Sequence, residues 1–136
     1  MMKIMVSYSD AVLSKNVVKE AQRHARAWSA NIEVVKAVER VEPIRRSRLE
    51  EMEAQFEAEV QALFDGVTIP YAAQMQVDDI GVGEKIVRIA KRKKVDLIFI
   101  GLKRKSKVGK LLFGSTAQYI ILNAPCPVVT VRPDLE

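Results

Sequence analysis

The sequence predicts an α/β protein with a single open, doubly wound, parallel five-stranded sheet and helices on both of its faces. Short apolar runs suited to strands alternate with longer segments in which apolar residues recur at helical spacing. The connections between these segments are short, which favours parallel crossover units. With 136 residues, 49% hydrophobic and 29% charged, the chain has room for one core, and we expect a single domain over residues 1–136.

The first half of the chain predicts two strands and two helices. We expect strands at residues 3–8 and 32–38. The helix between them is predicted to be capped by Ser14, and the second helix to start with the capping-box pattern Ser47-Arg-Leu-Glu50 and to stop near Gly66. The inward face of the first helix is expected to consist of Val17, Ala21, Ala25 and Trp28, and that of the second of Leu49, Met52, Phe56, Val60 and Leu63.

The second half predicts three more strands and two more helices. Strands are expected at residues 71–77, 95–100 and 127–131, and helices at residues 84–94 and 115–122. Ile86, Ile89 and Ala90 should point inward from the third helix. In such sheets ligands bind at the carboxyl ends of strands where the winding reverses. If the first and fourth strands are neighbours, the loops that follow them face one crevice.

The connection between the fourth strand and the fourth helix is rich in glycine and cations. It reads Gly-Leu-Lys-Arg-Lys-Ser-Lys-Val-Gly-Lys-Leu-Leu-Phe-Gly-Ser-Thr over residues 101–116. A helix start of this kind offers an anion unpaired N–H groups, the positive end of the helix dipole and charged side chains. The loop alone supports two interpretations, a nucleotide phosphate site and a solvated basic loop.

Several segments resemble the universal stress protein family. They are Lys3-Ile-Met-Val6, Ala30-Asn-Ile-Glu-Val-Val35, Val95-Asp-Leu-Ile-Phe-Ile-Gly101, Phe113-Gly-Ser115 and Ala124-Pro-Cys-Pro-Val-Val129. Members carry the signature G-x2-G-x9-G-[ST] after the fourth strand. Gly101 and Gly114 match its first and third glycines and Ser115 its hydroxyl position, whereas Arg104 replaces the second glycine.

The resemblance implies the strand order 3-2-1-4-5 and the binding of ATP or a related adenine nucleotide; whether Mg²⁺ accompanies it stays open. The implied nucleotide-contacting residues are Tyr8, Ser9, Asp10, Ala37, Val38, Ile100, Gly101, Lys103, Arg104, Gly114, Ser115 and Thr116. Ser9 stands where ATP-binding members commonly carry aspartate. Arg104 either contacts phosphate through its guanidinium or obstructs space that glycine leaves free.

The resemblance further implies a stress-response sensor or regulator that forms a homodimer. The last strand, which begins with Pro127, should lie at the sheet edge and pair with its counterpart in a second copy. A dimeric interaction module without a ligand is an alternative. Nucleic-acid binding is another, because residues 88–110 hold ten basic side chains against one acid, Asp96.

An enzyme is the weakest interpretation. No acid, base or nucleophile stands with a recognisable partner, and His24, between Arg23 and Arg26, is expected to face solvent. Ser115 and Thr116 resemble a helix N-cap, and Asp10 with Asp96 is the one acidic pair considered for Mg²⁺. No apolar run approaches membrane-spanning length and no signal peptide is evident. The single cysteine, Cys126, agrees with a reducing compartment, and we expect a cytoplasmic protein.

Overall fold

The computed structural model describes residues 1–104 and 111–133. Five strands form the main sheet: β1 (Lys3–Ser7), β2 (Asn31–Glu39), β3 (Tyr71–Asp78), β4 (Leu97–Gly101) and β7 (Val128–Val131). All of its pairings are parallel, and the order is β3-β2-β1-β4-β7. The predicted fold class and strand order are therefore confirmed. The winding reverses between β1 and β4, and this is where a ligand site is expected.

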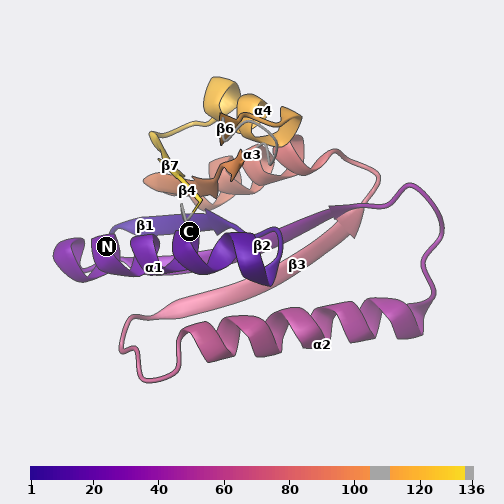
Figure 1. Ribbon diagram of the computed structural model, residues 1–136, viewed down its shortest axis with the longest axis horizontal. Coiled ribbons are helices and arrows are strands. Elements are labelled where there is room, and N and C mark those ends of the chain that lie inside the picture. The colour runs from indigo at the N-terminus through magenta and orange to yellow at the C-terminus, as the bar shows by residue number, and fades with distance from the viewer. Residues whose placement is uncertain (105–110, 134–136) are drawn as a thin grey trace.

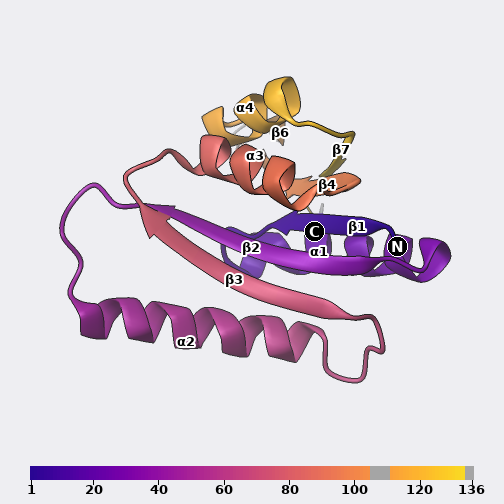
Figure 2. The same ribbon diagram turned by 180° about the vertical axis from the view of Figure 1, so that it is seen from behind.

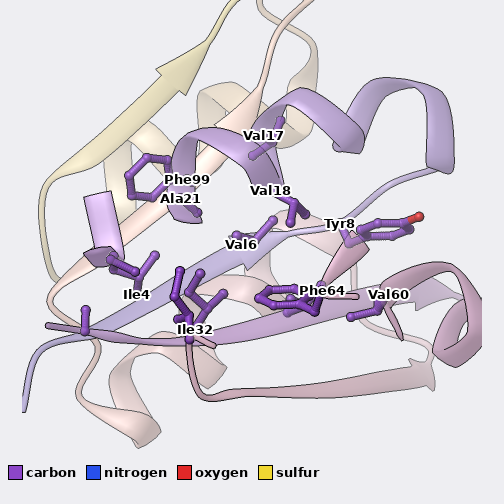
Figure 3. Close-up of a cluster of buried hydrophobic side chains, with 14 of the residues drawn as sticks. Ile4, Val6, Tyr8, Val17, Val18, Ala21, Ile32, Val60, Phe64 and Phe99 are labelled. Atoms are coloured by element: carbon purple, nitrogen blue, oxygen red, sulfur yellow. The ribbon is translucent and has the colours of Figure 1, made fainter. Parts of the chain in front are cut away.

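Four helices cover the two faces of this sheet: α1 (Ala11–Trp28), α2 (Arg46–Leu63), α3 (Val82–Lys93) and α4 (Ser115–Asn123). Figure 1 shows α1 and α2 on one face and α3 with α4 on the other, and the reverse view in Figure 2 shows the same layers. Alternate strand residues feed two cores. Ile4 and Val6 of β1 join the α1 and α2 side, which Figure 3 draws in close-up, whereas Met5 joins the α3 and α4 side.

The start of α1 differs from the prediction. Asp10, not Ser14, is the N-cap, and its side chain accepts a hydrogen bond from Leu13 N at 2.9 Å. Ser14 lies inside the helix and is 1% exposed. The predicted inward positions Val17, Ala21 and Ala25 are buried, but Trp28 is 62% exposed because α1 ends there, at the left-handed Ser29.

The start of α2 also differs from the prediction. The helix begins one residue before Ser47, and its N-cap, Arg45, makes no side-chain capping bond. The predicted apolar stripe is confirmed: Phe56 and Val60 are buried and the other three members are half-buried. Gly66 lies in the following turn at φ +72°, a backbone conformation that favours glycine.

On the opposite face, α3 and α4 pack closely. Ile86, Ile89 and Ala90 of α3 are buried, as predicted. A Cβ at Gly83 would lie 3.0 Å from Tyr119 Cβ and 3.2 Å from Thr116 O, so only glycine lets α3 approach the first turns of α4 this closely. This contact holds the first turns of α4 against α3.

Two features were not expected from the sequence. A short antiparallel ribbon, β5 (Lys103–Arg104) with β6 (Leu111–Leu112), follows β4. His24 is half-buried rather than solvated: its ring lies 5.0 Å from that of Phe99, edge to face, and Nδ1 lies 2.9 Å from Glu20 O. Within the described residues, no helix has both the length and the apolar character needed to span a bilayer.

Candidate functional site

A cleft of about 390 Å³ opens where β1 and β4 end, at the reversal of the sheet winding. The end of β1, the first two turns of α1, the end of β4 and the start of α4 form most of its wall. Its lining residues are Ser7, Tyr8, Ser9, Leu13, Ser14, Val17, Ala37, Val82, Ile100, Gly101, Lys103, Gly114, Ser115, Thr116, Ala117 and Ile120.

The α4 side of the cleft presents an uncapped helix start. Gly114 is the N-cap residue and makes no side-chain capping bond, so Ser115 and Thr116 do not act as the predicted cap. At this end of the helix, Gln118 N donates a hydrogen bond to Gly114 O at 3.0 Å. The N–H groups of the first turn are therefore suited to receive an anion, together with the hydroxyls of Ser115 and Thr116.

Gly114 is not required by the backbone or by packing. Its φ of −64° and ψ of 170° are open to any residue, and a Cβ there would meet no atom of the described residues within 4 Å. Among the described residues, none fills the space in front of this glycine. We expect a side chain at this position to occupy the entrance to the helix start.

On the β1 side of the cleft, most polar groups have partners within the protein. Ser9 N donates to Ser14 Oγ at 2.9 Å, and the two hydroxyl oxygens lie 3.4 Å apart. Two hydroxyls that share one contact can direct at most one hydrogen toward each other, so the pair retains one hydrogen for a ligand. Asp10, beside them, is committed to capping α1.

Gly101 at the end of β4 is required by packing. A Cβ there would lie 3.0 Å from Val17 Cγ2 and 3.6 Å from Leu13 O, tighter than ordinary van der Waals contact for the first of these. The glycine allows the first turns of α1 to lie against the end of β4. This approach brings Leu13, Ser14 and Val17 into the wall of the cleft.

The ring of Tyr8 lies at one end of the buried cluster in Figure 3. Its hydroxyl donates to Glu59 Oε1 of α2 at 2.7 Å, and its ring meets Phe56 edge to face with centroids 5.2 Å apart. Burial, followed by the neighbouring Glu59 carboxylate, raises the pKa of Tyr8 far above its usual value. Tyr8 therefore lines the cleft while its hydroxyl belongs to the contact between β1 and α2.

Most of the predicted site residues come together in this cleft. Nine line it: Tyr8, Ser9, Ala37, Ile100, Gly101, Lys103, Gly114, Ser115 and Thr116. Asp10 and Val38 do not, because Asp10 caps α1 and Val38 is half-buried one position beyond Ala37. The backbone of Arg104 pairs with Leu111, but its side chain lies outside what the structure describes.

Seven lining residues were missed by sequence reasoning: Ser7, Leu13, Ser14, Val17, Val82, Ala117 and Ile120. Ser14 carried a usable signal. It falls on the inward face of α1 with Val17, Val18 and Ala21, and a polar residue in such a face calls for a specific partner. The other six are small or apolar side chains that sequence alone does not distinguish from core residues.

The acidic pair considered for Mg²⁺ is not a site. Lys3 N donates to Asp96 Oδ2 at 2.8 Å, so Asp96 lies beside the start of β1, whereas Asp10 follows its end. Among the described residues no group of three or more His, Cys, Asp or Glu side chains is placed to hold a metal ion.

The structure is that of an open, doubly wound α/β protein, with an uncapped helix start at the point where the winding of the sheet reverses. The profile of the universal stress protein family matches residues 1–132. The chain belongs to this family.

One curated relative supports the assignment over the whole length. The universal stress protein in the QAH/OAS sulfhydrylase 3′ region of Thermus aquaticus is 33% identical over 138 residues, covering 95% of this chain and 97% of the relative. A universal stress protein of Mycolicibacterium smegmatis is 31% identical over 75 residues, which is 55% of this chain and 57% of the relative.

Solved structures share the fold. A universal stress protein of Archaeoglobus fulgidus superposes with a TM-score of 0.79 at 22% identity, covering 96% of this chain and 97% of the other. The universal stress protein from the same organism in complex with dAMP gives 0.75 at 19% identity, with 96% of each chain covered. A universal stress protein in complex with cAMP gives 0.73 at 18% identity, with 98% of each covered.

Proposed function

We propose that this protein binds ATP or a related adenine nucleotide in the cleft between β1 and β4 and acts as a sensor or regulator in the stress response. The observation that carries the proposal is the open, uncapped start of α4 facing a cleft at the winding reversal. The phosphates would lie against the N–H groups and hydroxyls of Ser115 and Thr116, with Lys103 adding positive charge.

The apolar part of the cleft wall suits a nucleoside. Apolar side chains come from Val17, Ala37, Val82, Ile100 and Ile120. A flat aromatic base gains from such contacts, and the Ser9 and Ser14 hydroxyls supply polar contacts that can either donate or accept. The two kinds of surface match the two ends of a nucleotide.

The ligands seen in proteins of the same fold agree with this assignment. Complexes with dAMP and with cAMP are among the structures that superpose on this chain. Those proteins are less than 25% identical to this one, so they support the ligand class and not the individual contacts.

A binding role is favoured over catalysis by the chemistry of the wall. Within the described lining, the titratable side chains are Tyr8 and Lys103. Tyr8 has a raised pKa and a committed hydroxyl, so it is poorly suited to proton transfer near neutral pH. We also propose that the protein is cytoplasmic, because its single cysteine, the free thiol of Cys126, agrees with a reducing compartment.

Titration calorimetry with AMP, ADP and ATP tests the proposal directly. We expect saturable binding of one nucleotide per chain. A folded protein that shows no heat with any of them, and that purifies without bound nucleotide, would favour the ligand-free interaction module.

Two substitutions at Arg104 decide between the interpretations of its role. If the guanidinium contacts phosphate, Arg104→Ala should weaken ATP binding by about 1.5–3 kcal/mol, the range for hydrogen bonds to charged groups. If the side chain obstructs the pocket, Arg104→Gly should tighten binding. Changes below about 0.5 kcal/mol in both variants would place Arg104 away from the ligand.

We also propose that two copies pair through the free edge of β7. In the main sheet β7 has β4 as its neighbour on one side, and edge strands invite pairing. The helix before it, α4, leaves Ile121 40% and Leu122 81% exposed, so apolar surface lies close to this edge in the chain. Sedimentation at micromolar concentration should give the mass of a dimer, and a monomeric mass would exclude this interface.

A further inference from the structure

The described lining of the cleft contains no carboxylate. Lys103 is the one charged side chain among the sixteen lining residues, and the others are apolar, hydroxyl-bearing or glycine. Residues 105–110, which lie outside the described ranges, read Lys-Ser-Lys-Val-Gly-Lys. No placement of that segment can bring an acid to the cleft.

The acids that adjoin lining residues already have partners. Asp10 follows Ser9, but its Oδ1 accepts the Leu13 N–H at 2.9 Å and so holds the first turn of α1. Glu59 accepts the Tyr8 hydroxyl at 2.7 Å through Oε1 and the Gln55 amide at 3.0 Å through Oε2. Neither carboxylate lines the cleft, and each is held where it is by the contact that it makes.

This donor set does not fit Mg²⁺. Mg²⁺ demands oxygen ligands in octahedral geometry and is normally held in proteins through one or two carboxylates together with substrate phosphates. The cleft instead offers phosphate a helix start and a cation, groups that attract negative charge directly. Mg²⁺ on the phosphates would cancel part of the charge that these groups recognise.

We propose that the cleft selects nucleotides free of Mg²⁺, so that free ATP binds more tightly than its magnesium complex. The inference rests on the proposed nucleotide function. Because a single phosphate holds Mg²⁺ much more weakly than a triphosphate chain, Mg²⁺ would weaken the binding of nucleoside triphosphates more than that of nucleoside monophosphates. The ligand class is therefore a nucleotide whose phosphates carry no Mg²⁺.

Titration calorimetry with and without Mg²⁺ tests this selection. ATP and AMP are each titrated in EDTA and in excess MgCl₂, with KCl used to match the ionic strength. We expect Mg²⁺ to weaken ATP about tenfold, the size of effect that loss of charge beside a cation and a helix start produces. The affinity for AMP should stay within about twofold, since AMP carries little Mg²⁺.

Two matched lysine variants assign the effect to the cleft. Lys103→Gln removes the cation of the lining and should reduce the Mg²⁺ penalty on ATP along with the affinity itself. Lys91→Gln makes the same charge change on an exposed residue in the last turn of α3 and should leave the penalty unchanged. Asp134→Asn with Glu136→Gln, which neutralises the acids outside the described residues at the chain end, should also leave it unchanged.

The outcomes separate this inference from the function on which it rests. Equal or tighter binding of ATP in Mg²⁺ overturns the inference and leaves the nucleotide site standing. A larger Mg²⁺ penalty in the Asp134 and Glu136 variant than in the wild type would place a carboxylate near the ligand and overturn it as well. Absence of binding by both nucleotides in both buffers removes the proposed function and this inference with it.

Discussion

The two walls of the cleft are built differently. On the β1 side, the polar groups have partners within the protein: Asp10 caps α1, Ser9 N bonds Ser14, and the Tyr8 hydroxyl bonds Glu59. On the α4 side, the helix start carries no side-chain cap, and no described residue lies in front of Gly114. Most polar groups of the first wall are bonded within the fold, whereas the second wall offers its donors to a ligand.

The signature glycines divide in the same way. At Gly101 a Cβ would press on Val17, but at Gly114 it would meet no atom of the described part of the chain within 4 Å. One sequence signature therefore contains a glycine needed by the fold and a glycine that the fold does not need. Substitutions on the β1 side should change stability, and substitutions on the α4 side should change binding.

The largest effect is expected for Gly114→Val. The backbone at this position accepts a β-branched residue, so the free energy of unfolding should change by no more than about 1 kcal/mol. The side chain would fill the entrance to the helix start, so nucleotide binding should fall below detection by titration calorimetry. Gly114→Ala, which adds a single methyl, should lie between the wild type and this variant.

A Gly114→Val protein with native stability and native affinity would contradict the assignment of the phosphates to the start of α4. The phosphate site would then lie elsewhere. A variant that fails to fold would show instead that the fold requires glycine at position 114.

Gly101→Ala should act on stability. We expect the free energy of unfolding to fall by about 1–3 kcal/mol because the new Cβ overpacks against Val17. Chemical denaturation provides the measurement. Val17→Ala removes the clashing methyl, so in the double variant the two losses should not add. Additive losses would mean that the strain arises from another contact.

Tyr8→Phe should cost about 1–2 kcal/mol, since it removes a hydrogen bond to a carboxylate. The cost depends on pH. The folded state holds the pKa of Tyr8 above that of an unfolded tyrosine, which ionises near pH 10, so this stabilisation is present at lower pH and declines as pH rises above about 10.

Paired denaturation curves of wild type and Tyr8→Phe from pH 8 to pH 11 measure this dependence. The difference between the two free energies should be constant at first and then shrink. A difference that grows with pH would contradict the sign of the shift.

The fold could be predicted from the sequence because each strand or helix is marked by several residues and not by one. The fourth strand, predicted from residue 95 and observed as Leu97–Gly101, is an apolar run, and the α2 stripe of Phe56 and Val60 recurs at helical spacing, so errors at single residues did not change the topology. Helix starts were less certain, since Ser14 and Ser47 resemble caps while Asp10 and Arg45 hold those places. The ribbon of β5 with β6 was missed because two residues per strand leave no periodic pattern.

The site followed less completely. Glycines and hydroxyls in the loops could be recognised, but the wall also needs Val17, Val82 and Ile120, whose inclusion depends on how helices cross the sheet. The different roles of Gly101 and Gly114 could not be predicted either, because Gly101 is required by its contact with α1, a helix more than eighty residues earlier in the chain. Tertiary contacts of this kind are absent from local patterns.

The smallest effect on stability is expected at the two helix starts whose N-caps were predicted wrongly. Asp10→Ala should lower the free energy of unfolding by about 1 kcal/mol, because Leu13 N loses its partner. Ser47→Ala should change it by less than about 0.5 kcal/mol, since Ser47 is an exposed residue in the first turn of α2 and not its cap.

Asp10→Asn, whose amide oxygen can still cap the helix, should keep most of the stability and also tests the cleft. Asp10 does not line the cleft, so the variant should bind nucleotide as well as the wild type or slightly more tightly, because a negative charge beside an anion site is removed. If Asp10→Asn kept its stability but lost affinity fivefold or more, about 1 kcal/mol, the Asp10 carboxylate would contact the nucleotide as well as cap α1.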